Sequence, residues 1–255
     1  MSFFSGYCRR QLRFALPLLL ALVVSDFASC AWASEDDRVD LASDRLIWTP
    51  TALATPPQKF SFRTVNLGFW HFGFKLNENW DVGFQTIPPF GFFALGPTVR
   101  FRKEIQPGLS IGAFGNVGVL YLFVLDNEFD NVDTTALYFG GGPLVSAGNG
   151  QRALNFSVLT YGGHAAGSTG YVVIPSVGGN LQVSNSIKLN LEVMTFLMPQ
   201  QKSNAEIWAV MYGIRLFGGH MHGDIAFLAP VGSGVGSLYK VSPLGIPVLQ
   251  FGASW

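Results

Sequence analysis

Apolar and polar residues alternate along most of the chain after Lys59. From Ile187 to Val193, every second residue is a large aliphatic residue, and the residues between them are polar or charged. A period of two is the pattern of a β-strand whose two faces meet different surroundings. Segments of this kind recur, with turn-forming residues between them. The pattern predicts strands over residues 59–65, 68–76, 80–87, 92–103, 109–123, 135–146, 152–161, 171–182, 187–196, 206–217, 222–230 and 245–255.

The connections between these strands differ in length at the two ends. Those after the even-numbered strands are short, as at 77–79 and 148–150, and those after the odd-numbered strands are mostly longer, including a Gly-rich loop expected over 162–170. Short turns at one end and long loops at the other are typical of outer-membrane barrels, which have even strand numbers. Because the number of strands should be even, we expect a break between two strands near Asn66. We predict an all-β fold, a closed antiparallel transmembrane β-barrel of about 12 strands over residues 58–255.

Composition supports this prediction. The chain contains 30 Gly and 23 Phe among 255 residues, and only 13% of its residues are charged. Such usage suits an all-β protein in an apolar solvent better than an average soluble domain. Beyond the N-terminal region, no run of apolar residues is long enough for a spanning helix. A membrane protein with this sequence would therefore have to be a closed barrel.

The N-terminal region predicts a secretory signal peptide over residues 1–33. Arg9, Arg10 and Arg13 precede an apolar stretch over 14–24, and Ala31-Trp32-Ala33 offers a cleavage site before Ser34. Removing residues 1–33 takes away three of the 16 basic and one of the 16 acidic residues, which leaves a net charge of −2. A chain with no basic excess is not expected to bind nucleic acid.

Both cysteines, Cys8 and Cys30, lie within the predicted signal peptide. The mature chain would therefore form no disulfide. An alternative is open, because Phe27-Ala28-Ser29-Cys30 is a weak lipobox that would make Cys30 a lipidated first residue. Residues 34–57 then form a periplasmic lead-in, which we expect to be poorly ordered unless it enters the barrel. The range 46–48, Leu-Ile-Trp, offers a short anchor for it.

The chain ends on an alternating strand with an aromatic last residue. Leu249, Phe251 and Trp255 lie in one period-two series. This ending resembles the C-terminal signal that the barrel-assembly machinery reads in outer-membrane β-barrels. The signal peptide, the strand–turn repeat and the range 73–80 are likewise similar to small, porin-like outer-membrane barrel proteins of Gram-negative bacteria. The resemblance implies an outer-membrane location, with outer-membrane lipid, lipopolysaccharide and the assembly machinery as partners. Oligomeric state stays open.

Charged residues on the polar strand faces are expected to line the lumen, because a lipid-facing charge costs about 2–4 kcal/mol at the bilayer midplane. Two alternatives follow. The surplus of basic residues makes an open, mildly anion-favouring lumen, or the charges pair with each other and with the lead-in and the barrel is plugged. The candidates are Lys59, Arg63, Lys75, Asp81, Arg100, Arg102, Lys188, Glu192, Arg215 and Asp224.

Candidate catalytic and metal sites are weak, and we predict no catalytic, cofactor or metal residues. Outer-membrane phospholipases with 12 strands carry a Ser two residues after the catalytic His, whereas Ser168 follows His164 by four. His220 and His222 have a metal-binding spacing without a third ligand nearby. The acidic range 126–133 is best interpreted as a solvated loop.

Two classes of function remain. The first is a passive outer-membrane channel or transporter for small solutes. The alternative is a non-conducting structural, adhesion or envelope-assembly barrel that acts through its external loops.

Overall fold

The computed structural model describes residues 40, 42–53, 58–87, 92–122, 134–165, 167–199, 207–232, 242 and 244–255. The predicted signal peptide, its cleavage site before Ser34, the Cys30 alternative and the acidic range 126–133 lie outside these residues.

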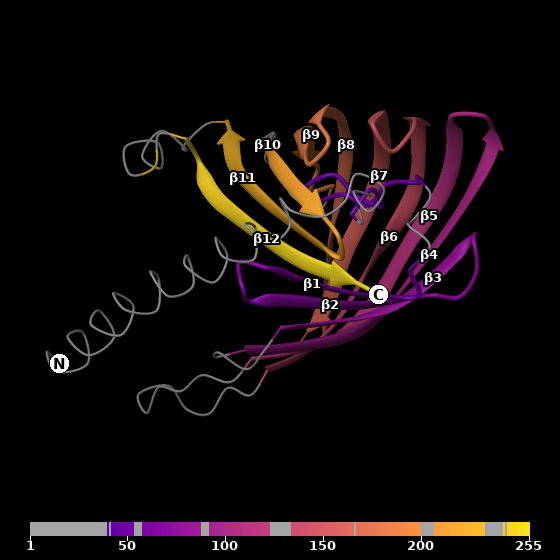
Figure 1. Ribbon diagram of the computed structural model, residues 1–255. Helices are drawn as coiled ribbons and strands as arrows, with labels where there is room; N and C mark the ends of the chain where they lie inside the picture. The colour runs from indigo at the N-terminus through magenta and orange to yellow at the C-terminus, as the bar shows by residue number, and fades with distance from the viewer. Residues whose placement is uncertain are drawn as a thin grey trace, which may run out of the picture.

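The described chain forms a closed barrel of 12 antiparallel strands (Figure 1). Each strand pairs with its neighbours in sequence, and the first strand pairs with the last. The predicted all-β fold, a closed antiparallel barrel of about 12 strands, is therefore confirmed. The strands are β1 (Phe60–Val65), β2 (Phe69–Lys75), β3 (Trp80–Ile87), β4 (Phe92–Gln106), β5 (Leu109–Leu122), β6 (Thr134–Gly148), β7 (Arg152–Ala165), β8 (Ser168–Ser184), β9 (Ile187–Phe196), β10 (Ile207–Gly218), β11 (Met221–Val231) and β12 (Ile246–Ser254).

The strand break near Asn66 is confirmed as a tight turn between β1 and β2. Asn66 and Leu67 adopt positive φ angles of 48° and 56°. Asparagine tolerates this left-handed conformation better than most residues, because its side chain can bond nearby backbone groups. Here the Asn66 Oδ1 atom accepts a hydrogen bond of 2.8 Å from the Leu249 amide of β12. The turn is thus tied to the last strand of the barrel.

The expected Gly-rich loop over 162–170 is wrong. Strand β7 continues to Ala165 and β8 begins at Ser168, so the connection is a tight turn with Gly167 at φ +78°. The ring of Phe139 on β6 occupies the space that a side chain at Gly162 would fill. Glycine here makes room for a neighbouring aromatic ring within the sheet and does not end the strand. The loop expected after the seventh strand is accordingly short.

Inward and outward residues alternate in burial along the strands. On β9, Lys188 and Glu192 are fully buried, whereas Leu189 and Leu191 are 44% and 52% exposed. Large exposed apolar residues recur in the same way on the outer face of most strands. The described residues contain no helix that is long and apolar enough to cross a membrane.

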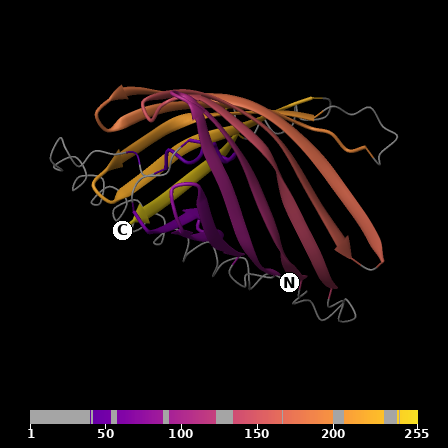
Figure 2. The ribbon, with the colours of Figure 1, turned by 90° about the vertical axis from the view of Figure 1, so that its right-hand side faces the viewer.

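The barrel wall is uneven in height. Strands β1–β3 have 6, 7 and 8 residues, whereas β4–β8 have between 14 and 17. Figure 2 shows the long strands lying side by side on one part of the wall. The low part of the wall therefore lies at β1–β3, where the barrel closes.

The closure joins the two ends of the barrel domain. The amides of Phe60 and Trp255 each donate to the carbonyl of the other, at 3.0 and 2.9 Å. Their rings are stacked, with centroids 5.5 Å apart. Trp255 thus completes the pairing between β1 and β12.

Replacing Trp255 by Ala should weaken this closure. An aromatic pair contributes about 0.5–1.5 kcal/mol beyond its buried area. We expect the free energy of unfolding in urea to fall by about 1 kcal/mol more in Trp255→Ala than in Trp208→Ala. Trp208 is also outward and exposed, but it has no ring partner among the described residues. Equal losses in the two variants would show that the ring pair does not stabilise the closure.

Candidate functional site

The described part of the lead-in lies inside the barrel, and we call residues 40 and 42–53 the plug. It is a small hairpin. The Thr51 amide donates to the Asp44 carbonyl at 2.8 Å, and the Leu46 amide donates to the Thr49 carbonyl at 3.0 Å. Arg45 and Pro50 pair as an isolated antiparallel bridge. The hairpin therefore presents Ile47 and Trp48 at its tip.

Backbone groups of the plug bond to several strands of the wall. The Ala52 amide donates to Ser146 Oγ of β6 at 2.8 Å. The side-chain amide of Gln250, on β12, donates to the Ile47 carbonyl. Because β6 and β12 lie on different parts of the barrel, the plug crosses the lumen.

Glu192 of β9 holds the tip of the plug. Its two carboxylate oxygens accept hydrogen bonds from the amides of Trp48 and Thr49, at 3.0 and 3.1 Å. Glu192 is fully buried. A buried carboxylate needs such donors, and the turn of the plug supplies two of them.

Arg215 of β10 is the centre of a buried ionic network. Its guanidinium forms a bidentate pair with Asp224 of β11, at 2.7 and 2.9 Å. It also donates to the plug carbonyls of Ala42 and Leu46, at 2.6 and 2.7 Å. Asp40 of the plug completes the network, with an ion pair to Lys188 of β9 and a longer one of 3.4 Å to Arg215. Arg215 and Lys188 have no exposed surface.

A second ionic cluster lies at β3 and β4. Asp81 of β3 pairs with Arg100 and Arg102 of β4. Arg100 also pairs with Asp44 of the plug, at 3.1 Å, and Asp44 pairs with its neighbour Arg45, at 2.7 Å. Two carboxylates are thus shared among three guanidinium groups.

The plug carboxylates are held in their charged form. Burial opposes ionisation of Asp40, but Arg215 and Lys188 outweigh it and hold the pKa of the carboxyl below its usual value. Burial also opposes ionisation of Asp44, but Arg45 and Arg100 hold its pKa well below the usual range. Both groups are therefore acceptors for wall cations at neutral pH.

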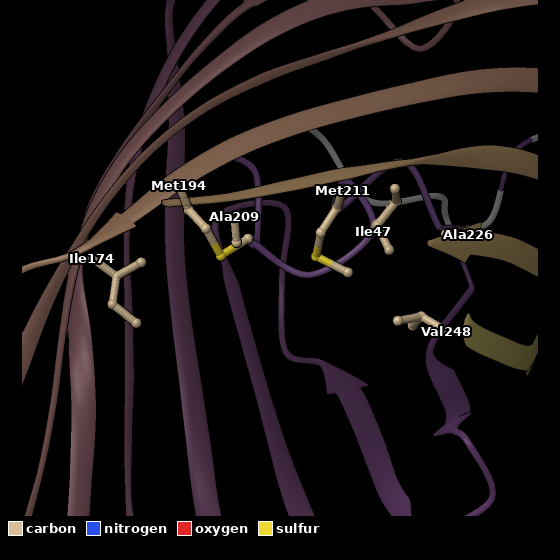
Figure 3. Close-up of a cluster of buried hydrophobic side chains, with 7 residues drawn as sticks. All are labelled: Ile47, Ile174, Met194, Ala209, Met211, Ala226 and Val248. Atoms are coloured by element: carbon tan, nitrogen blue, oxygen red, sulfur yellow. The ribbon is translucent and has the colours of Figure 1, made fainter. Parts of the chain in front are cut away.

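Apolar packing adds to these polar contacts. Leu46 lies over Gly178 of β8, where an added Cβ would come within 2.5 Å of Leu46 Cδ1. Ile47 packs against the inner faces of the strands from β8 to β12 (Figure 3). The buried members of this cluster are Ile47, Ile174, Met194, Ala209, Met211, Ala226 and Val248.

The structure places most of the sequence-predicted lumen residues in these contacts. Arg100, Arg102, Lys188, Glu192, Arg215 and Asp224 are buried, and Asp81 is half-buried. Arg63 and Lys75 are half-buried on β1 and β2, and Lys59 is exposed just before β1. Pairing of the lumen charges with the lead-in was one of the two alternatives from the sequence, but Asp40 and Asp44 were not identified as the partners. The surplus of basic over acidic lumen candidates was the signal, because buried cations need carboxylates from somewhere.

A cavity of about 590 Å³ occupies the part of the lumen that the plug leaves free. We call the end of the barrel that carries the β2–β3 and β10–β11 turns the short-turn end. Near this end the cavity is lined by Lys75 and Ser254, and in the other half by Leu120 and Phe196. Its first part is polar and cationic, with Arg63 on the wall. Its second part is mostly apolar. The arrangement can accommodate a small molecule with two unlike ends.

The histidines form no metal site within the described residues. His220 lies in the β10–β11 turn and its Nδ1 contacts the Ser254 carbonyl at 3.0 Å, whereas His222 points into the lumen. His164 contacts Thr169 at 2.7 Å. In the described ranges no three His, Cys, Asp or Glu side chains gather as metal ligands.

Comparison with known proteins finds no family model that matches this chain and no curated protein with significant similarity to it.

Neutralising Asp40 should release the plug. The variant Asp40→Asn leaves Lys188 buried without its carboxylate, and breaking a buried ion pair from one side costs about 3–5 kcal/mol. We expect amide hydrogen exchange of residues 42–53 to become at least about 100-fold faster. Adding Lys188→Met should recover part of the protection, because it removes the unpaired cation.

The matched control is Glu78→Gln, which neutralises an exposed acidic residue in the β2–β3 turn. The amide hydrogens of residues 42–53 in this variant should exchange at the wild-type rate. If Asp40→Asn exchanges no faster than this control, the ion pair does not hold the plug.

Plug binding should also depend on pH. A carboxyl group whose pKa is lowered in the folded state contributes its full stability above its ordinary pKa of about 3.9, and loses it as the pH falls through the folded value. Protection of residues 42–53, corrected for intrinsic exchange, should therefore be constant from pH 7 to 5 and fall below about pH 4. In Asp40→Asn only the part due to Asp44 should remain. Protection that is lost already near pH 6 would show that a group other than Asp40 and Asp44 controls the plug.

Proposed function

We propose that the protein is an outer-membrane β-barrel that transports small solutes, and that the plug constricts its lumen in the resting state. The observation that carries the proposal is the cavity beside the plug, which continues from the short-turn end into the other half of the barrel. Because ionic and hydrogen-bonded contacts hold the plug on the wall, it can act as a gate.

The outer face of the barrel supports the membrane location. Leu154, Phe156 and Val177 are 67%, 53% and 52% exposed on neighbouring strands of the closed wall. Soluble proteins rarely expose continuous apolar surface of this extent. Buried charges inside and exposed aliphatic residues outside are the arrangement that a lipid solvent favours.

The lumen supports transport through a constricted path. A 12-strand barrel lies between the eight-strand size, whose interior side chains fill, and open porins of 16 or more strands. Here the plug takes up part of that intermediate space, and the cavity is what remains. A water-filled path with more cationic than anionic side chains at one end would favour the passage of anions over cations.

The alternative is a non-conducting barrel. The number of buried contacts to the plug favours it, because Arg215 alone donates to the plug carbonyls of Ala42, Arg45 and Leu46. A plug that never leaves would make the barrel a scaffold for its external loops.

Planar-bilayer recordings of protein isolated from the outer-membrane fraction test these proposals. A folded barrel should migrate faster on a gel before boiling than after it. We expect small or rare conductance steps from the wild-type protein, and larger, steady steps from a variant that lacks residues 40–53. The double variant Asp40→Asn/Asp44→Asn keeps the full chain length and should also conduct more.

Heat-modifiable mobility shows in each case that the variant is folded. Equal conductance in the wild-type, deleted and doubly substituted proteins would contradict a gating plug. Silence from all three would favour the non-conducting barrel, and recovery of the protein in the soluble periplasmic fraction would overturn the membrane location.

A further inference from the structure

We propose that Arg63 and His222 bind the carboxylate of an amphipathic anion, a molecule with an apolar chain, and that this chain lies in the apolar part of the cavity. The inference rests on the proposed transport function and names its substrate class. It is carried by the position and unpaired state of these two side chains.

Arg63 lies on the inner face of β1, at the wall of the cavity. Its cross-strand neighbours are His71 on β2 and Gly252 on β12. Within the described chain Arg63 forms no ion pair, and its Nε atom is buried without a hydrogen-bond partner. A guanidinium carries several donors in a fixed fork that matches a carboxylate.

His222 reaches the same place from the other side of Gly252. It pairs with Gly252 across β11 and β12, and a Cβ added to that glycine would lie 2.6 Å from His222 Nε2. The missing side chain thus lets the imidazole ring lie between β11 and Arg63. His222 is 5% exposed, and neither ring nitrogen has a hydrogen-bond partner. Buried polar atoms are normally satisfied, and a neutral imidazole has one N–H group, so His222 can donate one hydrogen bond to a ligand that enters the cavity.

The acidic side chains of the described lumen already have partners. Asp44 and Asp81, the acidic residues that line the cavity, are already shared among Arg45, Arg100 and Arg102. Asp40 and Asp224 are taken by Lys188 and Arg215. An anion in the cavity would therefore meet a free guanidinium, whereas a cation would meet repulsion.

The apolar part begins next to Arg63. Val65, two residues further along the same face of β1, packs against the cluster around Ile47. Two residues of a strand span about 7 Å, so only the first few carbon–carbon bonds of a chain attached to an anion at Arg63 separate it from the apolar wall. Tyr161, Phe196 and Leu228 continue this wall. A volume of about 590 Å³ falls in the range of pockets that hold drug-sized ligands.

Competition binding tests the proposal with the full mature chain refolded in lipid nanodiscs. The fluorescent probe is 11-(dansylamino)undecanoate at pH 8, and the signal of empty nanodiscs is subtracted. The competitors are dodecanoate, dodecanol and dodecyltrimethylammonium, which share one chain and differ in the head group. We expect dodecanoate to displace the probe at a concentration about tenfold lower than dodecanol, and the ammonium compound to be weakest.

Substitutions then show which residues bind the head group of the ligand and which contact its apolar chain. Arg63→Met should remove the preference for dodecanoate over dodecanol, and Arg63→Lys should keep part of it. His222→Leu, which retains an apolar side chain of similar size, should reduce the preference about threefold. Leu228→Trp, which fills the apolar part, should weaken dodecanoate and dodecanol alike. Arg152→Met, on the outer face of β7, is the matched control and should bind as the wild type does.

Three results would overturn the inference. These are equal binding of dodecanoate and dodecanol by the wild type, a preference that survives Arg63→Met, and strongest binding of the ammonium compound. Heat-modifiable mobility confirms that each variant is folded. The bilayer recordings test the gating plug separately. If the wild type shows no preference for dodecanoate but the plug variants conduct more than the wild type, the substrate class is rejected and the transport proposal stands.

Discussion

The interior of this barrel depends on the pairing of Arg215 with Asp224 and with the plug. A guanidinium without exposed surface is tolerated only when carboxylates and carbonyl oxygens surround it. The wall supplies one carboxylate, and the plug supplies Asp40 and three carbonyl groups. The barrel and the lead-in are therefore one electrostatic unit, although they are far apart in the sequence.

Local patterns predicted the barrel because each strand carries its own alternation. In β9, Lys188 and Leu189 already show which way the two faces point, and at Asn66 the parity of the strand count located a weak turn. The loop predicted around Gly162 was wrong, because this glycine lies under the ring of Phe139 within a strand. Glycine is common both in loops and at positions where a neighbouring ring approaches a strand. The sequence alone cannot distinguish these two uses, since the ring belongs to another strand.

The site was less predictable than the fold. The candidates on the wall could be chosen by their strand faces, but their partners could not, because Asp40 lies 148 residues from Lys188 and 175 from Arg215. The excess of wall cations did indicate that acidic groups were missing. His222 and Arg63 were not linked either, because their proximity arises only when β11, β12 and β1 come together at Gly252.

The ionic character of the plug contacts bears on their role. Well-packed apolar residues would often hold a buried segment at least as firmly as buried ion pairs do, so stability alone gives little reason for charges at this interface. Ionic contacts differ in that they demand one geometry, and they lose their strength when water or a competing anion reaches them. A carboxylate bound at Arg63 would lie in the cavity that Asp44 and Arg45 of the plug also line. The proposed substrate class and the proposed gate would then be connected through electrostatics, because an added negative charge in this cavity also attracts Arg45 and Arg100, the cations that pair with Asp44.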